Sequence, residues 1–255
     1  MLVKNGEKYL ELILSRIATV ADEIILLDSG SQDQTRAIAE KWSAQWHFRP
    51  FDDFRSQRSY ALSLCRYQYV LFLDADEVPD DALLEHMRTL KQTGFSADAY
   101  CLRREWVVLG KRVHSIYPVN SPDFPVRLIN KDKVSFSGSA RVHEDYSGYA
   151  SKVILPGKIS HYTFNSQAEI RQKLNLYSTI AAEDMVENGK QFRFYKLIVN
   201  PLLAWGKWYF LKQGWRDGWA GVILANYACR YTFLKYRKYQ VSKKNHNGIE
   251  QKITK

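Results

Sequence analysis

The sequence predicts an α/β fold in which helices cover a mostly parallel sheet. The first 95 residues alternate strand and helix patterns, as βαβ units do. Two of these strands, at 23–27 and 69–73, are apolar runs that end in acidic residues. Residues 98–164 are richer in strand formers and turns, which indicates an antiparallel extension of the same sheet. At 255 residues with 45% hydrophobic side chains, the chain suits one sizeable domain with an appendage.

Apolar periodicity and turn residues predict the elements of this first part in order. Strands are expected at residues 1–3, 23–27, near His47 and at 69–73. Helices are expected at residues 7–19, 32–44, 57–65 and 80–91. Ser31 and Gln34 have the spacing of a capping box, and Asp80 with Asp81 suits the start of the last helix.

The remaining residues divide the chain into three predicted parts. Further strands are expected at 99–102, 106–109, 126–129 and 153–155, and the pattern becomes helical at Ser166. We therefore expect a catalytic domain over 1–165, a helical region over 166–240 and a polar, frayed tail over 241–255.

Three carboxylates follow the strand at 69–73, in the segment Asp74-Ala75-Asp76-Glu77. Clustered acids at the end of a buried strand repel one another, so a divalent cation such as Mg²⁺ or Mn²⁺ would explain them. A solvated loop that leads into the next helix is the alternative. The strand at 23–27 also ends in a carboxylate, Asp28, beside a tight turn at Gly30. Because parallel strands present their carboxyl ends at one edge, the two sites suggest one shared ligand crevice.

Charge and cysteine content narrow the class of protein. Residues 190–255 hold 14 Lys and Arg against 2 acids, whereas residues 1–189 hold 23 against 25. The net charge of +10 therefore belongs to the C-terminal region. Three widely spaced cysteines give neither a zinc pattern nor a disulfide framework, which favours a reducing compartment. The opening residues lack the apolar core of a signal peptide.

Residues 197–240 combine aromatic and basic side chains with broad apolar faces. Four tryptophans lie within fifteen residues: Trp205, Trp208, Trp215 and Trp219. This composition is typical of a membrane interface, and no apolar run reaches the ~20 residues of a spanning helix. We expect two helices lying on an anionic membrane surface with these tryptophans at headgroup depth. A buried helical hairpin is the alternative, and the apolar content argues against nucleic acid as the partner.

Glycine-rich phosphate loops and the common hydrolase motifs are absent from the sequence. Several segments instead resemble inverting family 2 glycosyltransferases, among them Lys4-Asn5-x-Glu7, Asp28-Ser-Gly-Ser-x-Asp33-x-Thr35 and Phe72-Leu-Asp74-Ala-Asp76-Glu77. Later motifs are similar to those of bacterial lipopolysaccharide inner-core β-glucosyltransferases; they include Arg127-Leu128, Val142-His143-Glu144, His161-Tyr-x-Phe164 and Gly214-Trp-x-Asp217-Gly. The resemblance extends to about Tyr239.

This resemblance implies a GT-A fold, a nucleotide-sugar donor such as a UDP-hexose, and Mg²⁺ or Mn²⁺ as cofactor. The site residues that it implies are Asp28, Asp33, Arg58 and Asp74 for the donor, Asp76 and His161 for the metal, and Glu144 as general base. It also implies a lipid-linked saccharide as acceptor and a peripheral position on the cytoplasmic face of the bacterial inner membrane.

Two other functions fit parts of the pattern. Asp74-x-Asp76-x-Val78 also matches the start of a haloacid-dehalogenase-type phosphatase, with Asp74 as nucleophile. That fold usually places the motif on its first strand, whereas two βα units precede it here. A non-catalytic, membrane-bound module that binds nucleotide sugars would keep the crevice and lack a base.

Overall fold

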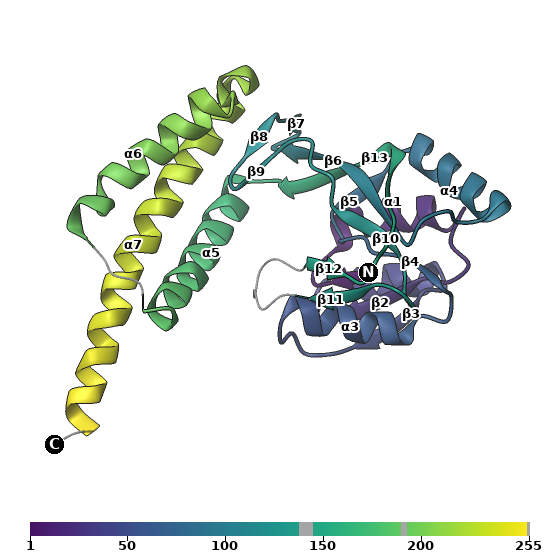
Figure 1. Cartoon of the computed structure of the whole chain (residues 1–255), viewed down its shortest axis with the longest axis horizontal. Helices are drawn as coiled ribbons and strands as arrows, with labels where there is room; N and C mark the ends of the chain where they lie inside the picture. Colours follow the sequence, from purple (N-terminus) through teal and green to yellow (C-terminus); the bar gives the residue numbers. More distant parts are fainter. Residues whose placement is uncertain (138–144, 190–192, 254–255) are drawn as a thin grey trace. The chain divides into compact units, whose positions relative to one another are not determined.

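The computed structural model describes residues 1–137, 145–189 and 193–253 (Figure 1). The chain divides into two compact units. The first contains Met1–Glu105 and Pro122–His161, and the second contains Trp106–Ser121 and Tyr162–Lys255. The first unit ends four residues before the predicted boundary at 165, and a short segment from the middle of the chain belongs with the C-terminal helices.

The first unit begins with the predicted parallel βα units. Strands β1 (Leu2–Val3), β2 (Ile25–Asp28) and β3 (Gln45–Phe48) lie side by side and parallel. They alternate along the chain with helices α1 (Glu7–Ile17), α2 (Thr35–Lys41) and α3 (Phe54–Leu64). All four residues of β2 are buried, as its apolar run predicts. Asp28 is the last residue of this strand, so its carboxylate lies at the carboxyl edge.

A second, mostly antiparallel sheet provides the extension. Its strand order is β4 (Tyr69–Leu71), β10 (Val126–Asn130), β6 (Ala99–Val108), β13 (Lys152–Phe164) and β5 (Glu77–Pro79). An isolated parallel bridge between Leu2 and Asp74 joins β1 to the end of the β4 segment. The two strands predicted over 99–109 form one strand, because Arg104 and Glu105 in its middle have oppositely charged partners. The remaining strands are short: β7 (Lys111–Arg112), β8 (Ser115–Ile116), β9 (Val119–Asn120), β11 (Ser135–Ser137) and β12 (Asp145–Ser147).

Two helix starts show how local side chains decide the boundaries. Helix α4 (Asp81–Thr93) begins after Asp80, whose carboxylate accepts a hydrogen bond from the Leu83 N–H, as predicted. The capping box predicted for α2 is wrong. The Ser31 hydroxyl donates to Asp28 instead, and α2 begins only at Thr35.

The mixed α/β architecture of the first unit agrees with the expected GT-A type. One apolar cluster joins β2, α3, β6, β10 and β11 through buried side chains: Leu27, Ala61, Phe72, Ala99, Ile129, Val134 and Phe136. This core fixes the strand ends that carry the acidic residues, because close-packed interiors leave little freedom for their backbone.

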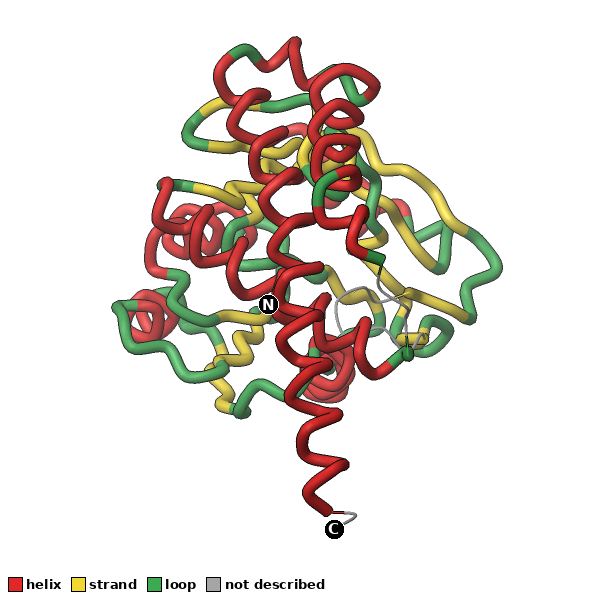
Figure 2. The backbone as a smooth tube through the Cα atoms, turned by 90° about the vertical axis from the view of Figure 1, so that its left-hand side faces the viewer, coloured by secondary structure: helices red, strands yellow, loops and turns green. Residues whose placement is uncertain are grey.

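The second unit is mainly helical (Figures 1 and 2). Helices α5 (Gln167–Glu187) and α6 (Val199–Gly206) each lie along the long helix α7 (Trp219–Ile253). Three short helical turns connect them: η1 (Phe194–Leu197), η2 (Lys207–Leu211) and η3 (Gly214–Asp217). Helix α7 continues past residue 240, where the polar tail was expected to begin. In the part of the chain that the structure describes, no helix is long and apolar enough to cross a membrane.

The tryptophans of this unit do not share one environment. Trp215 and Trp219 are exposed, as the membrane-interface prediction requires. Trp208 is only 6% exposed and packs edge-on against Tyr117, so its predicted place at headgroup depth is wrong. The Trp205 indole N–H donates to Asn226 on α7. Composition could not separate these cases, because an aromatic ring suits a helix contact as well as an interface.

Candidate active site

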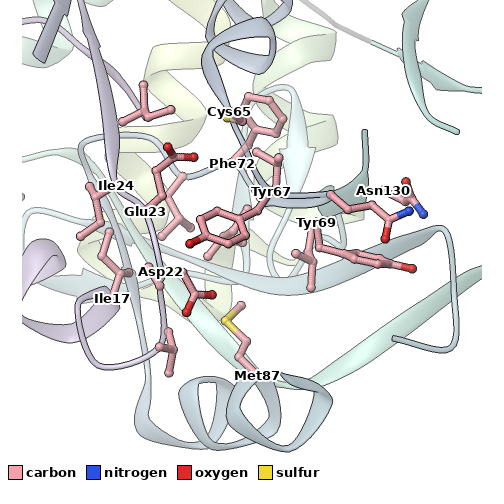
Figure 3. Close-up of a pocket in the computed structure, with 18 of the residues that line it drawn as sticks. Ile17, Asp22, Glu23, Ile24, Cys65, Tyr67, Tyr69, Phe72, Met87 and Asn130 are labelled. Atoms are coloured by element: carbon pink, nitrogen blue, oxygen red, sulfur yellow. The ribbon is translucent and has the colours of Figure 1, made fainter. Parts of the chain in front are cut away.

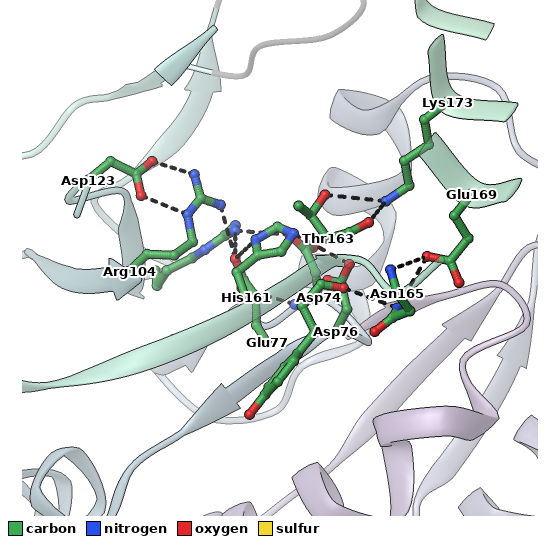
Figure 4. A network of polar contacts seen from close by, with 12 residues as sticks. Asp74, Asp76, Glu77, Arg104, Asp123, His161, Thr163, Asn165, Glu169 and Lys173 are labelled. Carbon is green, nitrogen blue, oxygen red and sulfur yellow. Dashed lines mark hydrogen bonds and ion pairs between the residues drawn. The ribbon is translucent and has the colours of Figure 1, made fainter. Parts of the chain in front are cut away.

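Arginines neutralise two of the three carboxylates that follow β4. Asp74 accepts hydrogen bonds from Arg58 at 3.1 Å and from Arg127 at 2.9 Å. Glu77 is fully buried and forms ion pairs with Arg127 and Arg104 (Figure 4). Burial would raise the pKa of Glu77, but Arg127, His161 and Arg104 hold it well below its ordinary value. The mutual repulsion inferred from the sequence is therefore offset mainly by these guanidinium groups.

The third carboxylate, Asp76, faces a histidine from a distant part of the chain. Strands β5 and β13 pair so that His161 lies opposite Glu77. The pairing places His161 Nε2 3.4 Å from Asp76 Oδ2 and His161 Nδ1 3.4 Å from Glu77 Oε1. Burial lowers the pKa of His161, but the two carboxylates outweigh burial and raise it to about 9.

Asp76 and His161 fit a divalent cation as a pair of ligands. Two ligand atoms held about 2.1 Å from one ion at right angles lie about 3 Å apart, close to the observed separation. The second ring nitrogen of His161 faces Glu77, as the outer nitrogen of a metal-bound histidine usually faces a carboxylate. Within residues 1–137, 145–189 and 193–253, no group of three or more His, Cys, Asp and Glu could hold a metal. Mg²⁺ commonly takes one or two protein ligands and completes its shell with phosphate and water.

Asp28 and Asp74 come close to the same strand, as expected for one crevice. Val3 of β1 pairs with Asp28, and Leu2 of β1 pairs with Asp74. Asp28 also holds its own turn, since its carboxylate accepts hydrogen bonds from the Gly30 N–H and from the N–H and hydroxyl of Ser31. Gly30 has φ of +103°, a conformation that favours glycine. A donor contact by Asp28 stays a prediction.

Asp33 takes part in hydrogen bonds that connect the motif beginning at Lys4 with the motif beginning at Asp28. Its carboxylate accepts from the Thr35 N–H and from the Glu7 N–H at the start of α1. In return, the Glu7 carboxylate accepts from the Gln34 N–H. The side chain of Asn5 accepts from the N–H of the neighbouring Gln32. These reciprocal bonds explain why the motif beginning at Lys4 occurs together with the motif beginning at Asp28. The predicted role of Asp33 in donor binding stays a prediction.

Of the two remaining predicted residues, Arg58 lies within the described part of the chain and Glu144 does not. Arg58 is buried on α3, with its guanidinium against Asp74 and over the ring of Phe72. Its predicted contact with the base or diphosphate stays a prediction. Glu144, the predicted general base, lies outside the described residues.

A cavity of about 660 Å³ opens between β2 and β4 (Figure 3). Its lining includes Ile25, Tyr69, Leu71 and Met87, together with the N-terminal residue. Asp74, Asp76 and His161 do not line it. This cavity is therefore separate from the candidate metal ligands Asp76 and His161, and we do not assign the chemistry to it.

Sequence reasoning gave no role to two of the arginines that organise the site, since it quoted Arg127 only within a family motif and did not single out Arg104. Arg127 lies on β10 between apolar neighbours, and Arg104 lies in the middle of β6. Arg104 bridges Glu77 and Asp123. A charged residue inside an apolar strand is a signal in itself, because a buried charge requires a partner of opposite sign. The identity of that partner depends on strand pairing, which the sequence does not show.

Comparison with known proteins places the chain in a family. Residues 1–138 match the family described as Glycosyl transferase family 2. The chain belongs to this family. The match contains Asp28, Asp33, Arg58, Asp74 and Asp76, whereas His161 and Glu144 follow it. The resemblance stated from the sequence motifs is thereby confirmed.

Relatives of this family 2 chain extend over nearly its whole length. It is 31% identical over 242 residues to the lipopolysaccharide core biosynthesis glycosyltransferase LpsC of Rhizobium meliloti (strain 1021), covering 92% of this chain and 88% of that protein. It is 26% identical over 257 residues to the uncharacterized glycosyltransferase RC0292 of Rickettsia conorii, covering 96% of this chain and 91% of the relative.

Solved structures give weaker similarities. Staphylococcus aureus TarS 1-349 aligns with a TM-score of 0.45 and 15% identity, covering 96% of this chain and 90% of that one. Glucosyl-3-phosphoglycerate synthase from Mycobacterium tuberculosis, solved with Mn²⁺ and uridine-diphosphate-glucose, aligns with a TM-score of 0.34 and 21% identity over 42% of each chain.

Proposed function

We propose that this glycosyltransferase moves a hexose, with glucose as the expected sugar, from a UDP-linked donor to a hydroxyl of a lipid-linked saccharide. Lipopolysaccharide core is the acceptor class that the relative LpsC suggests. The reaction proceeds with inversion in a single displacement and depends on Mg²⁺ or Mn²⁺. It takes place at the cytoplasmic face of the bacterial inner membrane.

The paired Asp76 and His161 beside Glu77, in a family 2 chain, carry this proposal. A divalent cation held by Asp76 and His161 would neutralise charge on the leaving nucleoside diphosphate. Arg127 and Arg58 fix the carboxylate of Asp74 beside that position. Glu77 fixes the histidine ring, so that Nε2 faces Asp76. These contacts hold the site in place before a donor arrives, which electrostatic catalysis requires.

A thermal-shift screen of nucleotides and nucleotide sugars, with and without Mn²⁺, tests the proposal. A ligand at 100 times its dissociation constant stabilises the native state by about 2.7 kcal/mol. We expect UDP and a UDP-hexose to raise the melting temperature only when Mn²⁺ is present. If no nucleotide raised the melting temperature in the presence of Mn²⁺, the assignment of a UDP-linked donor would be contradicted.

Two assays separate the alternatives. Metal-dependent hydrolysis of a generic aryl phosphate would favour the haloacid-dehalogenase-type phosphatase, which family membership leaves without support. Donor binding without transfer to any saccharide acceptor would favour the non-catalytic module.

Glu144→Gln should lower turnover by about 10²-fold or more, the usual scale of general-base catalysis, and leave donor affinity nearly unchanged. Turnover and Mn²⁺-dependent UDP affinity should be measured on the same preparation. Near wild-type turnover would show that the base is elsewhere, and Asp145, Asp123 or His143 would then be the next residues to replace.

A further inference from the structure

Helix α6 is apolar on its outer face and forms hydrogen bonds on its inner face. Leu202 and Leu203 are 65% and 64% exposed. On the side that meets α7, the Asn200 amide donates to the Tyr236 hydroxyl and the Trp205 indole donates to Asn226. Surface helices of water-soluble domains show the opposite arrangement. A sustained exposed apolar face marks a surface that meets another apolar phase.

The exposed apolar side chains continue on both sides of α6. Their spacing follows the three- and four-residue period of one helix face, and η2 extends the line. We call these six residues the outer stripe: Tyr195, Ile198, Leu202, Leu203, Phe210 and Leu211. The rings of Trp205, Tyr209 and Phe210 contact one another at the C-terminal end of the stripe. Such clustered aromatic rings are typical of the membrane–water interface.

The sequence segment that contains the outer stripe carries charges of one sign. Between Asn188 and Arg216 the sequence contains no Asp or Glu. It contains six basic residues there: Lys190, Arg193, Lys196, Lys207, Lys212 and Arg216. The next acid, Asp217, is buried, and its carboxylate accepts from the His114 backbone N–H. A protein partner would need a matching acidic surface, whereas an anionic bilayer supplies both negative headgroups and an apolar layer.

We propose that the outer stripe lies in the interfacial layer of an anionic bilayer, parallel to the membrane plane. Lys207 and Lys212 reach the headgroups, and the leucines of α6 enter the acyl boundary. This inference deepens the proposed function by naming the surface that meets the membrane. It replaces the four-tryptophan belt predicted from the sequence, since the buried Trp208 and the hydrogen-bonded Trp205 instead hold the stripe in place.

Vesicle co-sedimentation of the full chain, without nucleotide or saccharide, tests the proposal. We expect Leu202→Glu/Leu203→Glu to reduce partitioning onto phosphatidylglycerol-containing vesicles by about tenfold or more, because two charges would enter the apolar boundary. Leu12→Glu/Ile154→Glu is the matched control, because these exposed apolar side chains belong to the other unit. The control should bind vesicles like the wild type. Circular dichroism and melting temperature establish that both variants are folded.

A second pair of variants tests the charge contribution. Lys207→Gln/Lys212→Gln should weaken binding to phosphatidylglycerol vesicles by about thirtyfold, since each of the two lysines near an anionic surface contributes on the order of 1 kcal/mol. Its weak binding to phosphatidylcholine vesicles should not change. Wild-type partitioning by the leucine variant would overturn the proposal. The proposal would also be overturned if the wild type were a dimer and Leu202→Glu/Leu203→Glu dissociated it without reducing vesicle binding. Because the assay contains no donor, neither result depends on the transferase proposal.

Discussion

Asp76→Asn is expected to lower turnover by about 10³-fold and to remove most Mn²⁺-dependent binding of UDP. The amide is nearly isosteric with the carboxylate but is a poor ligand for a hard cation. Metal stabilisation of a transition state contributes several kcal/mol, and each 1.36 kcal/mol corresponds to a factor of ten in rate. Titration calorimetry with UDP, with and without Mn²⁺, measures the binding change directly.

Asp81→Asn is the matched control, because Asp81 is a nearby aspartate whose side chain is 92% exposed and pairs with Arg16. This control should bind UDP and Mn²⁺ like the wild type. The melting temperature of Asp76→Asn should stay near that of the wild type, since Arg127 and Arg104 still neutralise Glu77. Unchanged Mn²⁺-dependent UDP binding in Asp76→Asn would count decisively against Asp76 as a metal ligand.

Arg127→Met is expected to reduce the free energy of unfolding by about 3–5 kcal/mol, the usual cost of removing one partner from a buried ion pair. Arg127 contacts both Asp74 and Glu77, and Glu77 is fully buried. Methionine fills much of the volume of the arginine side chain, but it leaves the buried carboxylate of Glu77 with less positive charge beside it. A fall of about 10 °C in melting temperature should result for a chain of this size.

Arg88→Met is the comparison for this change, because Arg88 pairs with Glu85 on α4 and the two side chains are 40% and 68% exposed. Its melting temperature should hardly change, since surface ion pairs contribute little. Arg127→Lys should recover part of the lost stability, because it keeps the charge but not the fork of donors. If Arg127→Met unfolds at the wild-type temperature, the ion-pair network does not stabilise the first unit.

Local signals predicted much of the first unit. The apolar runs before Asp28 and Asp74 give strands, and Asp80 caps α4 as its spacing indicates. These features depend on near neighbours, whose preferences a sequence states directly. The wrong capping box occurred where two local preferences competed. Ser31 could cap a helix or bond to Asp28, and its hydroxyl bonds to Asp28.

The sequence by itself determined which side chains have groups that can bind a metal or a donor, and the family motifs named Asp76 and His161 as metal ligands. Only the tertiary structure decided which groups meet. The pairing of β5 with β13 brings His161 to Asp76, and the pairing of β10 with β4 accompanies the contact between Arg127 and Asp74. In the same way, tertiary packing that includes Tyr117 buries Trp208 and leaves Leu202 exposed, although composition favours both for a membrane surface. Strand register and helix packing join residues far apart in the chain, and local preferences do not encode those distances.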